Sequence, residues 1–468
     1  MIPKILHQMW IGPKEAPHKM MTSWKVNNPD YEYIYWNESE IERRGMKFVC
    51  KKQIDEICEI NGKCDIMRWE ILYKYGGVFV DADSICIEAL DDYFLDNEGF
   101  ATYENENVRK NLVATGTMGF IPQHQLCSDI IEWIHDSPKS EETIKSHKAW
   151  FSVGPGLLTT FLNTGNYKEF SVYPSYLFLP IHHTGVMYEG HKKVFAHQEW
   201  CTSSQSYETV NQVCLPSILS KPKIEISILI SSYNTNIVFV RDCLNSIVNQ
   251  RGWFTIEVVW CNDGSDDYHS NLLELELKNI SKNSRFLTIV YERTLKNMGN
   301  FICLNRGVTK CSNEYIFKMD SDDVMAPNRI IDQYQFMIKN PEIVVSGGGI
   351  RMFNESGVIR DVYHQHILKW EDFIKENERS SWIMNHPTLC YKKSAVISVG
   401  NYNELFFGEY LMEDYDLELR LMKKFGAVYN MPNILVYYRV HSNQLTSGID
   451  ILKTNELSKK IWENMFAE

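Results

Sequence analysis

The chain of 468 residues contains no apolar run of the roughly 18 residues that a bilayer crossing needs. Its first ten residues are too polar and too interrupted for a signal peptide. An excess of Lys and Arg is also missing: the formal net charge is -12, which argues against nucleic acid as the main partner. The 12 cysteines show no metal-binding spacing. These absences predict a cytoplasmic protein with reduced thiols and no transmembrane segment.

The composition is that of a globular protein, 44% hydrophobic and 23% charged, and the length favours two domains. Short β-branched runs alternate with helical patterns, which indicates an α/β fold. Ser, Thr, Asn and Pro gather without periodicity over 206–223, directly before a new apolar strand. We therefore predict domains at 1–205 and 224–468, joined by a linker at 206–223. Both share one plan, in which a strand ends in paired aspartates and a His-bearing segment follows late.

The first group of polar residues lies early in the chain. Apolar residues at helical spacing predict a helix over 62–75, with Asp65 and Arg68 on one face. Two glycines end this helix, and a short buried strand then leads into Asp81 and Asp83. Because side chains alternate along a strand, the two aspartates should point the same way. A hard divalent ion bound to a diphosphate would relieve their repulsion.

This order of motifs resembles the DXD sugar-transferase group of glycosyltransferase family 32, over roughly residues 1–205. The opening strand, 2–12, matches as well. Gly154 to Gly156 resembles a turn on the acceptor side of that family, and His197 resembles its late histidine. The usual Ser-Trp end of the late motif is absent here, so a structural role for His197 stays an alternative.

The resemblance implies a role for each matching residue. Trp10 would stack on the nucleotide base, although a strand tryptophan often belongs to the core. Asp65 and Arg68 would bind the donor sugar and its phosphate, unless Arg68 only pairs with Asp65. Asp81 would contact the ribose or the sugar, and Asp83 would ligate the metal. The family retains the anomeric configuration, so no dedicated general base is expected.

The second group follows three strands of the C-terminal half. One strand ends near Tyr233, another runs into Asn262 and Asp263, and a third ends at Asp320, two residues before Asp322. In an open α/β sheet the carboxyl ends of the strands are where ligands bind. The sequence therefore predicts a second binding site at this edge.

These motifs resemble glycosyltransferase family 2 over about residues 224–447. The resemblance implies that Tyr233 and Asp263 hold the uracil of a UDP-sugar, and that Asn297 lines the donor pocket. Asp320 would contact the ribose, and Asp322 would ligate the metal. Asn262 departs from the aspartate that is usual in the second motif. A segment at 386–388 resembles an acceptor-side motif.

A late helix and strand complete the resemblance. The family places its catalytic base at the second acid of a Glu-Asp pair, which is Asp414 here; Glu413 and Asp416 are alternatives, and acids also favour the first turn of any helix. Arg439 and His441 should share one face of a strand and approach the diphosphate, with His441 as a metal or phosphate ligand.

The sequence therefore predicts an α/β protein of two tandem nucleotide-sugar-binding, Rossmann-like domains of the GT-A type. The expected function is a bifunctional glycosyltransferase with one Mn²⁺ or Mg²⁺ per domain, nucleotide-sugar donors and a glycan acceptor. One alternative keeps a single active C-terminal transferase with a degenerate N-terminal binding module. A non-enzymatic carbohydrate- or nucleotide-binding scaffold is another. A nucleotidyltransferase lacks support, because no glycine-rich phosphate loop is present.

Overall fold

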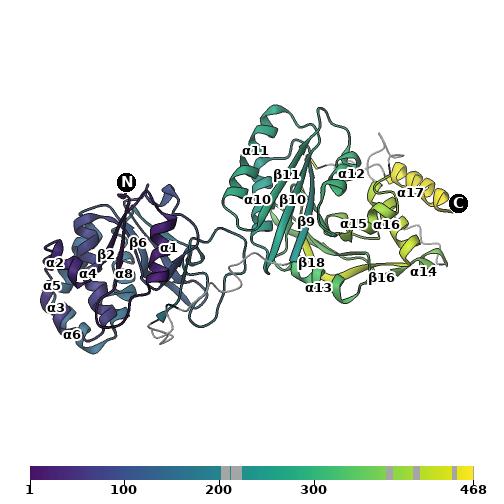
Figure 1. Cartoon of the computed structure of the whole chain (residues 1–468). Coiled ribbons are helices and arrows are strands. Elements are labelled where there is room, and N and C mark those ends of the chain that lie inside the picture. The colour runs from purple at the N-terminus through teal and green to yellow at the C-terminus, as the bar shows by residue number, and fades with distance from the viewer. Residues whose placement is uncertain (202–210, 212–223, 376–382, 404–411, 445–450, 467–468) are drawn as a thin grey trace. The chain divides into compact units, whose positions relative to one another are not determined.

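A computed structural model describes residues 1–201, 211, 224–375, 383–403, 412–444 and 451–466 (Figure 1). The chain divides into two compact units, Met1–Tyr188 with Lys193–Ser217 (unit 1) and Glu189–Lys192 with Ile218–Glu468 (unit 2). The predicted linker at 206–223 lies outside the described residues, except for Asn211. Among the helices of the described residues, none is both long enough and apolar enough to cross a membrane.

Unit 1 is built on a six-stranded sheet in the order β2-β1-β3-β6-β5-β7. Its strands are β1 (Ile5–Met9), β2 (Glu32–Trp36), β3 (Gly77–Val80), β5 (Gly99–Asn105), β6 (Arg109–Phe120) and β7 (Phe170–Tyr173). A two-stranded sheet pairs β4 (Ser84–Cys86) with β8 (Ala196–Gln198). Strands β2, β1 and β3 run parallel, so their carboxyl ends meet at one edge.

Helices cover this sheet. They are α1 (His18–Asn27), α2 (Glu38–Arg43), α3 (Lys51–Glu56), α4 (Ile60–Tyr75), α5 (Gln125–Asp136), α6 (Pro138–Ser146), α7 (Ala149–Ser152) and α8 (Pro155–Leu162), with the 3-10 turns η1 (Asp92–Phe94) and η2 (Ser175–Leu177). Helix α4, predicted over 62–75, fully buries Ile66, Trp69 and Leu72. Burial of a large apolar side chain stabilises the folded state by about 1.5–3 kcal/mol.

Gly76 and Gly77 turn the chain from α4 directly into β3. Both have positive φ, +63° and +94°, where side chains are rarely tolerated. A Cβ on Gly77 would also lie 2.6 Å from the Ile5 carbonyl oxygen. The glycine pair is therefore required by a tight connection, and this connection brings the start of α4 and the end of β3 to one site.

Unit 2 contains a larger mixed sheet, with β11-β10-β9-β12-β17-β14-β18-β13 in order, β15 paired to β14 and β16 paired to β18. Its strands are β9 (Ile224–Ser232), β10 (Phe254–Asn262), β11 (Leu287–Arg293), β12 (Tyr315–Asp320), β13 (Val324–Met325), β14 (Val345–Asn354), β15 (Gly357–Val362), β16 (Ile367–Lys369), β17 (Cys390–Lys392) and β18 (Ala427–Arg439). Strands β11, β10, β9 and β12 are parallel. Strands β10, β9 and β12 are mostly buried, which explains their apolar runs, whereas the edge strand β11 is partly exposed.

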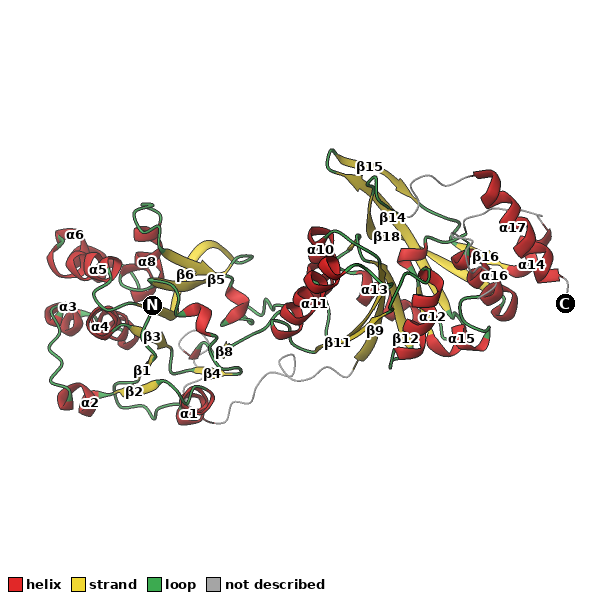
Figure 2. Cartoon of the chain, turned by 90° about the horizontal axis from the view of Figure 1, so that it is seen from above, coloured by secondary structure: helices red, strands yellow, loops and turns green. Residues whose placement is uncertain are grey.

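The helices of unit 2 lie on both faces of this sheet (Figure 2). They are α10 (Ile237–Val248), α11 (Asp267–Lys282), α12 (Asn300–Lys310), α13 (Arg329–Lys339), α14 (Trp370–Lys375), α15 (Lys393–Ser398), α16 (Glu413–Phe425) and α17 (Ile451–Phe466), with the 3-10 turn η5 (His386–Thr388). One core packs α10, α11 and α13 on the sheet, and another packs α12, α15, α16 and α17. The prediction of an α/β protein with two tandem Rossmann-like domains is confirmed.

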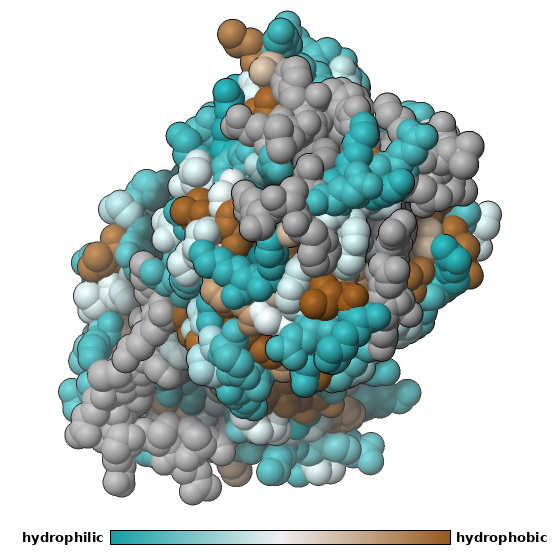
Figure 3. Space-filling view, turned by 90° about the vertical axis from the view of Figure 1, so that its right-hand side faces the viewer, coloured by the Kyte–Doolittle hydropathy of each residue, from teal (hydrophilic) through white to brown (hydrophobic). Residues whose placement is uncertain are grey.

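One face of the molecule is mixed in character where its residues are described. In the face that Figure 3 presents, hydrophobic residues are scattered among hydrophilic ones. Single exposed apolar residues are normal on a protein surface and mark no interface by themselves. The polar groups at the sheet edges are therefore the stronger candidates for functional sites.

Candidate functional site

The paired acids of unit 1 lie in the turn after β3 and not on the strand itself, which ends at Val80. The expectation that strand alternation aligns them was therefore wrong. A hydrogen-bond donor brings them together instead: Gln198 Nε2 donates to Asp83 Oδ1 at 2.6 Å and to Asp81 Oδ2 at 3.3 Å. The Cys201 amide donates to Asp83 Oδ2 at 2.8 Å. The two carboxylates thus converge through contacts with a late segment of the chain.

Arg68 joins α4 to this turn. Its Nη2 donates to Asp81 Oδ1 at 2.7 Å, and its Nη1 lies 3.5 Å from Asp65 Oδ1. The guanidinium is buried over the Phe79 ring and also donates to the Thr115 carbonyl. Arg68 is thus more than a partner of Asp65 within the helix, because it links the acids of two elements.

Burial disfavours the ionised form of the carboxyl groups in this acidic cluster. It raises the pKa of Asp65 to about 6. Burial, together with the neighbouring charge of Asp81, raises the pKa of Asp83 to about 6 as well. The cluster therefore favours a positively charged ligand, because a cation would reduce the cost of holding several carboxylates together.

Two glycines make room for the acids. A Cβ on Gly154 would lie 2.7 Å from Asp65 Oδ2, and a Cβ on Gly116 would lie 2.8 Å from Asp81 Oδ2. Gly154 directly precedes α8. The predicted acceptor-side turn at 154–156 is therefore in contact with Asp65.

Gln198 was missed by the sequence analysis, which selected its neighbour His197. Strand β8 pairs with β4 so that Ser84 lies opposite Gln198. Because adjacent strand residues face opposite sides, Gln198 reaches the acids while His197 is buried with Nε2 at 3.1 Å from Glu199 Oε1. The only signal in the sequence was the position of Gln198 next to the late histidine.

Trp10, expected to stack on a base, lies at the end of β1 and is partly buried. Its Nε1 donates to the Lys14 carbonyl at 2.8 Å. Its ring packs against a small cluster that includes Met21 and Ala82, the residue between the paired acids. Trp10 is therefore adjacent to the Asp81–Asp83 turn, with part of its ring exposed.

In unit 2 the second pair of acids lies at the end of β12. Asp320 is the last residue of the strand, and Asp322 follows in the turn. His441 Nε2 lies 2.9 Å from Asp322 Oδ2, and Arg439 Nε donates to the Asp322 carbonyl at 2.8 Å. Burial and the charge of Asp320 raise the pKa of Asp322. Strand β18 ends at Arg439, so His441 lies outside it. The prediction that the two residues share one face of a strand was therefore wrong. Both nevertheless contact Asp322.

A buried lysine was also missed. Lys318 lies on β12 with 1% of its surface exposed, and its ammonium forms an ion pair with Asp320. Arg439 adds a second cation, whose Nη2 donates to Asp242 Oδ2 at 2.8 Å. This edge therefore holds cations beside its carboxylates, and Arg and Lys side chains are the usual partners of phosphate groups in proteins.

Asp263 fixes the loop between β11 and α12. Its carboxylate accepts hydrogen bonds from the Met298 amide at 2.8 Å and from the Gly299 amide at 2.9 Å. Asn297, next to these residues, is exposed, as is Tyr233 at the end of β9. The residues expected to hold the base thus lie around one loop of unit 2.

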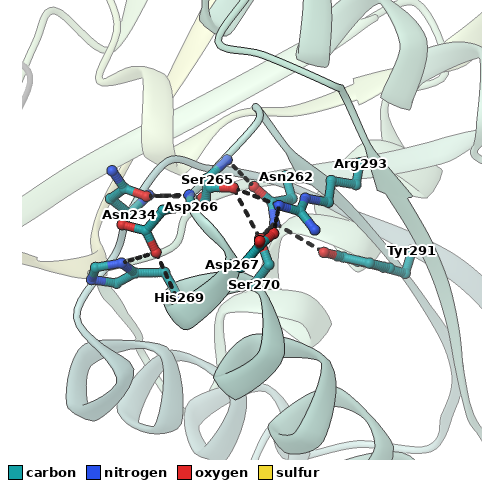
Figure 4. A network of polar contacts seen from close by, with 9 residues as sticks. All are labelled: Asn234, Asn262, Ser265, Asp266, Asp267, His269, Ser270, Tyr291 and Arg293. Carbon is teal, nitrogen blue, oxygen red and sulfur yellow. Dashed lines mark hydrogen bonds and ion pairs between the residues drawn. The ribbon is translucent and has the colours of Figure 1, made fainter.

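The departure at Asn262 has a structural reason (Figure 4). Its Nδ2 donates to Ser270 Oγ at 3.0 Å and to the Tyr291 hydroxyl at 2.9 Å, and its Oδ1 accepts from the Ser265 amide at 3.0 Å. Asn234 joins the same network, since its amide donates to Ser265 Oγ and its Oδ1 accepts from the Asp266 amide. The amide of Asn262 supplies both a donor and an acceptor, which an ionised aspartate could not.

Helix α16 begins with three acids. Within the described residues Asp414 is the one whose carboxylate is not engaged by another side chain, and its Oδ1 accepts from the adjacent Tyr415 amide at 2.8 Å. Glu413 accepts from Asn300 Nδ2 at 2.9 Å, and Asp416 pairs with Arg420 at 2.5 Å. Burial and the charge of Glu413 raise the pKa of Asp414 to about 7, a value suited to a general base.

His386, in the predicted acceptor-side segment, lies in η5. Its Nε2 is 2.9 Å from the Tyr402 hydroxyl, and burial lowers its pKa well below the ordinary value. It is therefore a neutral hydrogen-bonding group.

Comparison with known proteins identifies a family region in each unit. Residues 227–406 match the glycosyl transferase family 2 model, and residues 15–101 match the model of the glycosyltransferase sugar-binding region containing the DXD motif. An uncharacterised glycosyltransferase of Haemophilus influenzae is 31% identical, covering 47% of this chain and 78% of its own length.

Two further proteins are similar. The amylovoran biosynthesis glycosyltransferase AmsE of Erwinia amylovora is 30% identical, covering 47% of this chain and 77% of its own. The structure of S. aureus TarS 1-349 in complex with UDP-GlcNAc is 17% identical, with a TM-score of 0.39 and coverage of 52% of this chain and 67% of that one.

Proposed function

Because the chain is a glycosyltransferase whose C-terminal unit belongs to family 2, we propose that it is bifunctional, with each unit transferring a sugar from a nucleotide-sugar donor to a hydroxyl of a glycan acceptor. The observation that supports this most is a repeated design. In each unit two aspartates lie at or just after the carboxyl end of a strand, and a late segment returns a side chain to them. Gln198 contacts Asp83 in unit 1, and His441 contacts Asp322 in unit 2.

A divalent cation, Mn²⁺ or Mg²⁺, fits both groups of residues. Carboxylate oxygens are the ligands that these hard ions prefer, and the acids of each site are crowded and partly buried. Asp83 would hold the ion in unit 1, and Asp322 with His441 would hold it in unit 2. When bound, the ion supplies positive charge that stabilises the leaving diphosphate.

In unit 2 we assign the acid–base step to Asp414. The acceptor oxygen bonds to the anomeric carbon while the bond from that carbon to the diphosphate breaks, and the hydroxyl proton passes to the Asp414 carboxylate. Attack from the side opposite the leaving group inverts the anomeric centre. Glu413 and Asp416 are less suited, because Asn300 and Arg420 already engage them.

The remaining residues of unit 2 bind the donor, for which we propose a UDP-sugar. Tyr233 and Asp263 hold the base, and Asn297 lines the same pocket. Asp320 contacts the ribose, and Arg439 neutralises the diphosphate beside Asp322. The hydrogen bonds of Asp263 to the Met298 and Gly299 amides support this assignment, since they order the loop at the base.

In unit 1 we propose transfer with retention. Trp10 stacks on the base, Asp65 and Arg68 bind the sugar and its phosphate, and Asp81 contacts the ribose or sugar. The acceptor oxygen bonds to the anomeric carbon from the face that the diphosphate leaves as its bond to that carbon breaks. The hydroxyl proton passes to the departing diphosphate oxygen, so no protein carboxylate is needed as a base. The link from Arg68 to Asp81 supports this assignment, because it orders the acid beside the metal ligand Asp83.

The test is hydrolysis and transfer across UDP-, GDP- and CMP-sugars with Mn²⁺, comparing the full-length chain with Asp83→Ala and Asp322→Ala. Asp136→Ala and Asp372→Ala, whose side chains are 67% and 62% exposed, serve as matched controls in units 1 and 2. If each site variant loses turnover of a different donor, both units are transferases. Loss of all turnover with Asp322→Ala alone would instead make unit 1 a binding module. Turnover that ignores both acids would refute the proposal.

A further inference from the structure

A second cluster of metal-binding side chains lies in unit 1, outside the paired acids. Glu104, His182 and His183 each offer one ligand atom, and these atoms lie within 4.8 Å of one another. Glu104 comes from the end of β5, whereas the two histidines come from the segment at 180–188. Neither the family models nor the proposed transfer reactions assign these three residues a role.

The backbone of the 180–188 segment is held in a tight hairpin. The His182 amide donates to the Val186 carbonyl at 2.9 Å, and the Gly185 amide donates to the His182 carbonyl at 2.8 Å. The Tyr188 amide donates to the Pro180 carbonyl at 2.7 Å. The two histidines are therefore presented by a defined loop, and their arrangement does not depend on long side chains alone.

The ring of His182 is oriented as a metal ligand would be. Its Nδ1 lies 2.8 Å from the Thr184 hydroxyl, and its Nε2 lies 3.2 Å from Glu104 Oε1. Metal-ligating histidines typically use their second ring nitrogen in such an outer hydrogen bond, which fixes the ring. His182 and Glu104 are only 1% and 6% exposed, while His183 is exposed and leaves a path for an ion.

We propose that Glu104, His182 and His183 form a binding site for a divalent transition metal of the zinc class. Two imidazoles and one carboxylate are a ligand set that zinc accepts, with a fourth position left for water. Nitrogen ligands make Mg²⁺ a poor fit and favour Co²⁺, Ni²⁺, Cu²⁺ and Zn²⁺. The site therefore differs in metal preference from the carboxylate sites proposed above, and it does not depend on them.

Arg109 competes with a metal at this site. Its Nη1 lies 3.3 Å from Glu104 Oε1, and its side chain is 42% exposed. Because a guanidinium repels a bound cation, the ion must use the second oxygen of Glu104 or displace the arginine. Removing this charge should therefore tighten metal binding.

The site also has a structural connection to the paired acids. The ring of Trp200 lies 5.1 Å from that of His182 and 5.4 Å from that of His183, and its Nε1 donates to the Ile181 carbonyl at 2.9 Å. The next residue, Cys201, donates its amide to Asp83. A metal that anchors the hairpin thus supports the segment that positions Asp83.

The test is Co²⁺ titration of the full-length chain, stripped with EDTA and carrying Asp83→Asn and Asp322→Asn to remove the carboxylate sites. One equivalent should bind with the visible bands of a four-coordinate nitrogen and oxygen site, and Zn²⁺ should displace it. Loss of a residue that only hydrogen-bonds to a metal ligand typically lowers metal affinity about 10- to 100-fold. In that background Glu104→Gln and His183→Asn, which remove ligands themselves, should each lower Co²⁺ affinity by at least this factor. His147→Asn, at another exposed histidine, should bind normally.

His183→Asn keeps the test decisive if the buried Glu104→Gln variant fails to fold, because His183 is exposed. Removal of the Arg109 charge by Arg109→Ala should raise the affinity severalfold. The proposal is overturned if no Co²⁺ binds, or if both ligand variants bind as tightly as their parent. Intense sulfur-to-cobalt charge-transfer bands would also overturn it, since they would assign the ion to some of the 12 cysteines.

Discussion

Replacing Asp414 by Asn tests the proposed base directly. The change removes the proton acceptor but keeps an oxygen for the Tyr415 amide, so the first turn of α16 should survive. A positioned general base is worth about 10²- to 10⁴-fold in rate. We therefore expect kcat to fall by that factor, about 3–5 kcal/mol in activation free energy, with little change in the KM for the donor.

The pH dependence supplies a second, independent readout. The pKa of Asp414 is raised to about 7, and only the ionised carboxylate can accept a proton. Below this pH, kcat/KM of the wild type should fall by about tenfold per pH unit, and above it the rate should level off. The residual activity of Asp414→Asn should lack this inflection.

Stability should change in the opposite sense to activity. A raised carboxyl pKa means that the folded state binds the proton more tightly than the unfolded chain, so the group favours folding at low pH and this contribution is lost as the pH rises through 7. Asp414→Asn should thus have a higher Tm than wild type at pH 8 and a similar Tm at pH 4. This result would show that the lost activity does not come from unfolding.

The assay is initial-rate nucleotide release from the donor that Asp322→Ala fails to use. Glu413→Gln and Asp416→Asn are the matched controls, since they change neighbouring acids of the same helix. Asp416→Asn should lose stability, because it breaks the buried pair with Arg420. If Asp414→Asn keeps its rate within tenfold of wild type, or if Glu413→Gln alone abolishes turnover, the assignment of the base is refuted.

Three further changes have defined outcomes. Gln198→Leu removes the donor that joins Asp81 to Asp83 and should raise the Mn²⁺ concentration required by unit 1 about 10- to 100-fold, measured by metal titration of its donor turnover, without affecting unit 2. Gly264→Ala should lower the free energy of unfolding by more than about 1 kcal/mol in a denaturant titration, because φ is +68° and a Cβ would lie 2.2 Å from a Lys296 backbone atom. Trp69→Ala should lower the free energy of unfolding of unit 1 by about 3–5 kcal/mol, because the core around Trp69 belongs to unit 1 alone. In calorimetry the Tm of only one of two transitions should fall; an equal fall in both would contradict separate cores.

The elements that carry strong periodicity were predictable from the sequence. Helix α4 was expected over 62–75 and occurs at Ile60–Tyr75, because its apolar spacing and the two glycines after it define both its face and its end. The α/β class followed from the same alternation. The burial of β9 and β12 likewise followed from their continuous apolar runs.

The errors arose where tertiary pairing decides which side chain faces the site. His197 and Gln198 are neighbours, and only the register of β8 on β4 determines that Gln198 meets the acids. Lys318 lies two residues before Asp320 on one strand, so alternation alone could have paired them; the burial of the lysine is what the sequence did not show. The Asp81–Asp83 turn shows the same limit, since the two carboxylates converge through Gln198, which comes from a late segment of the chain.

The charge distribution connects the two sites to their expected ligands. A chain with a net charge of -12 repels an anionic diphosphate at long range, and the paired acids at each sheet edge add to this repulsion. In unit 1 the buried Arg68 contacts the acids, and it is already shared between Asp65 and Asp81. The nucleotide-sugar that we propose for unit 1 would therefore need positive charge from outside the protein, which a bound divalent cation would supply. Unit 2 differs, because Lys318 and Arg439 already lie beside its acids.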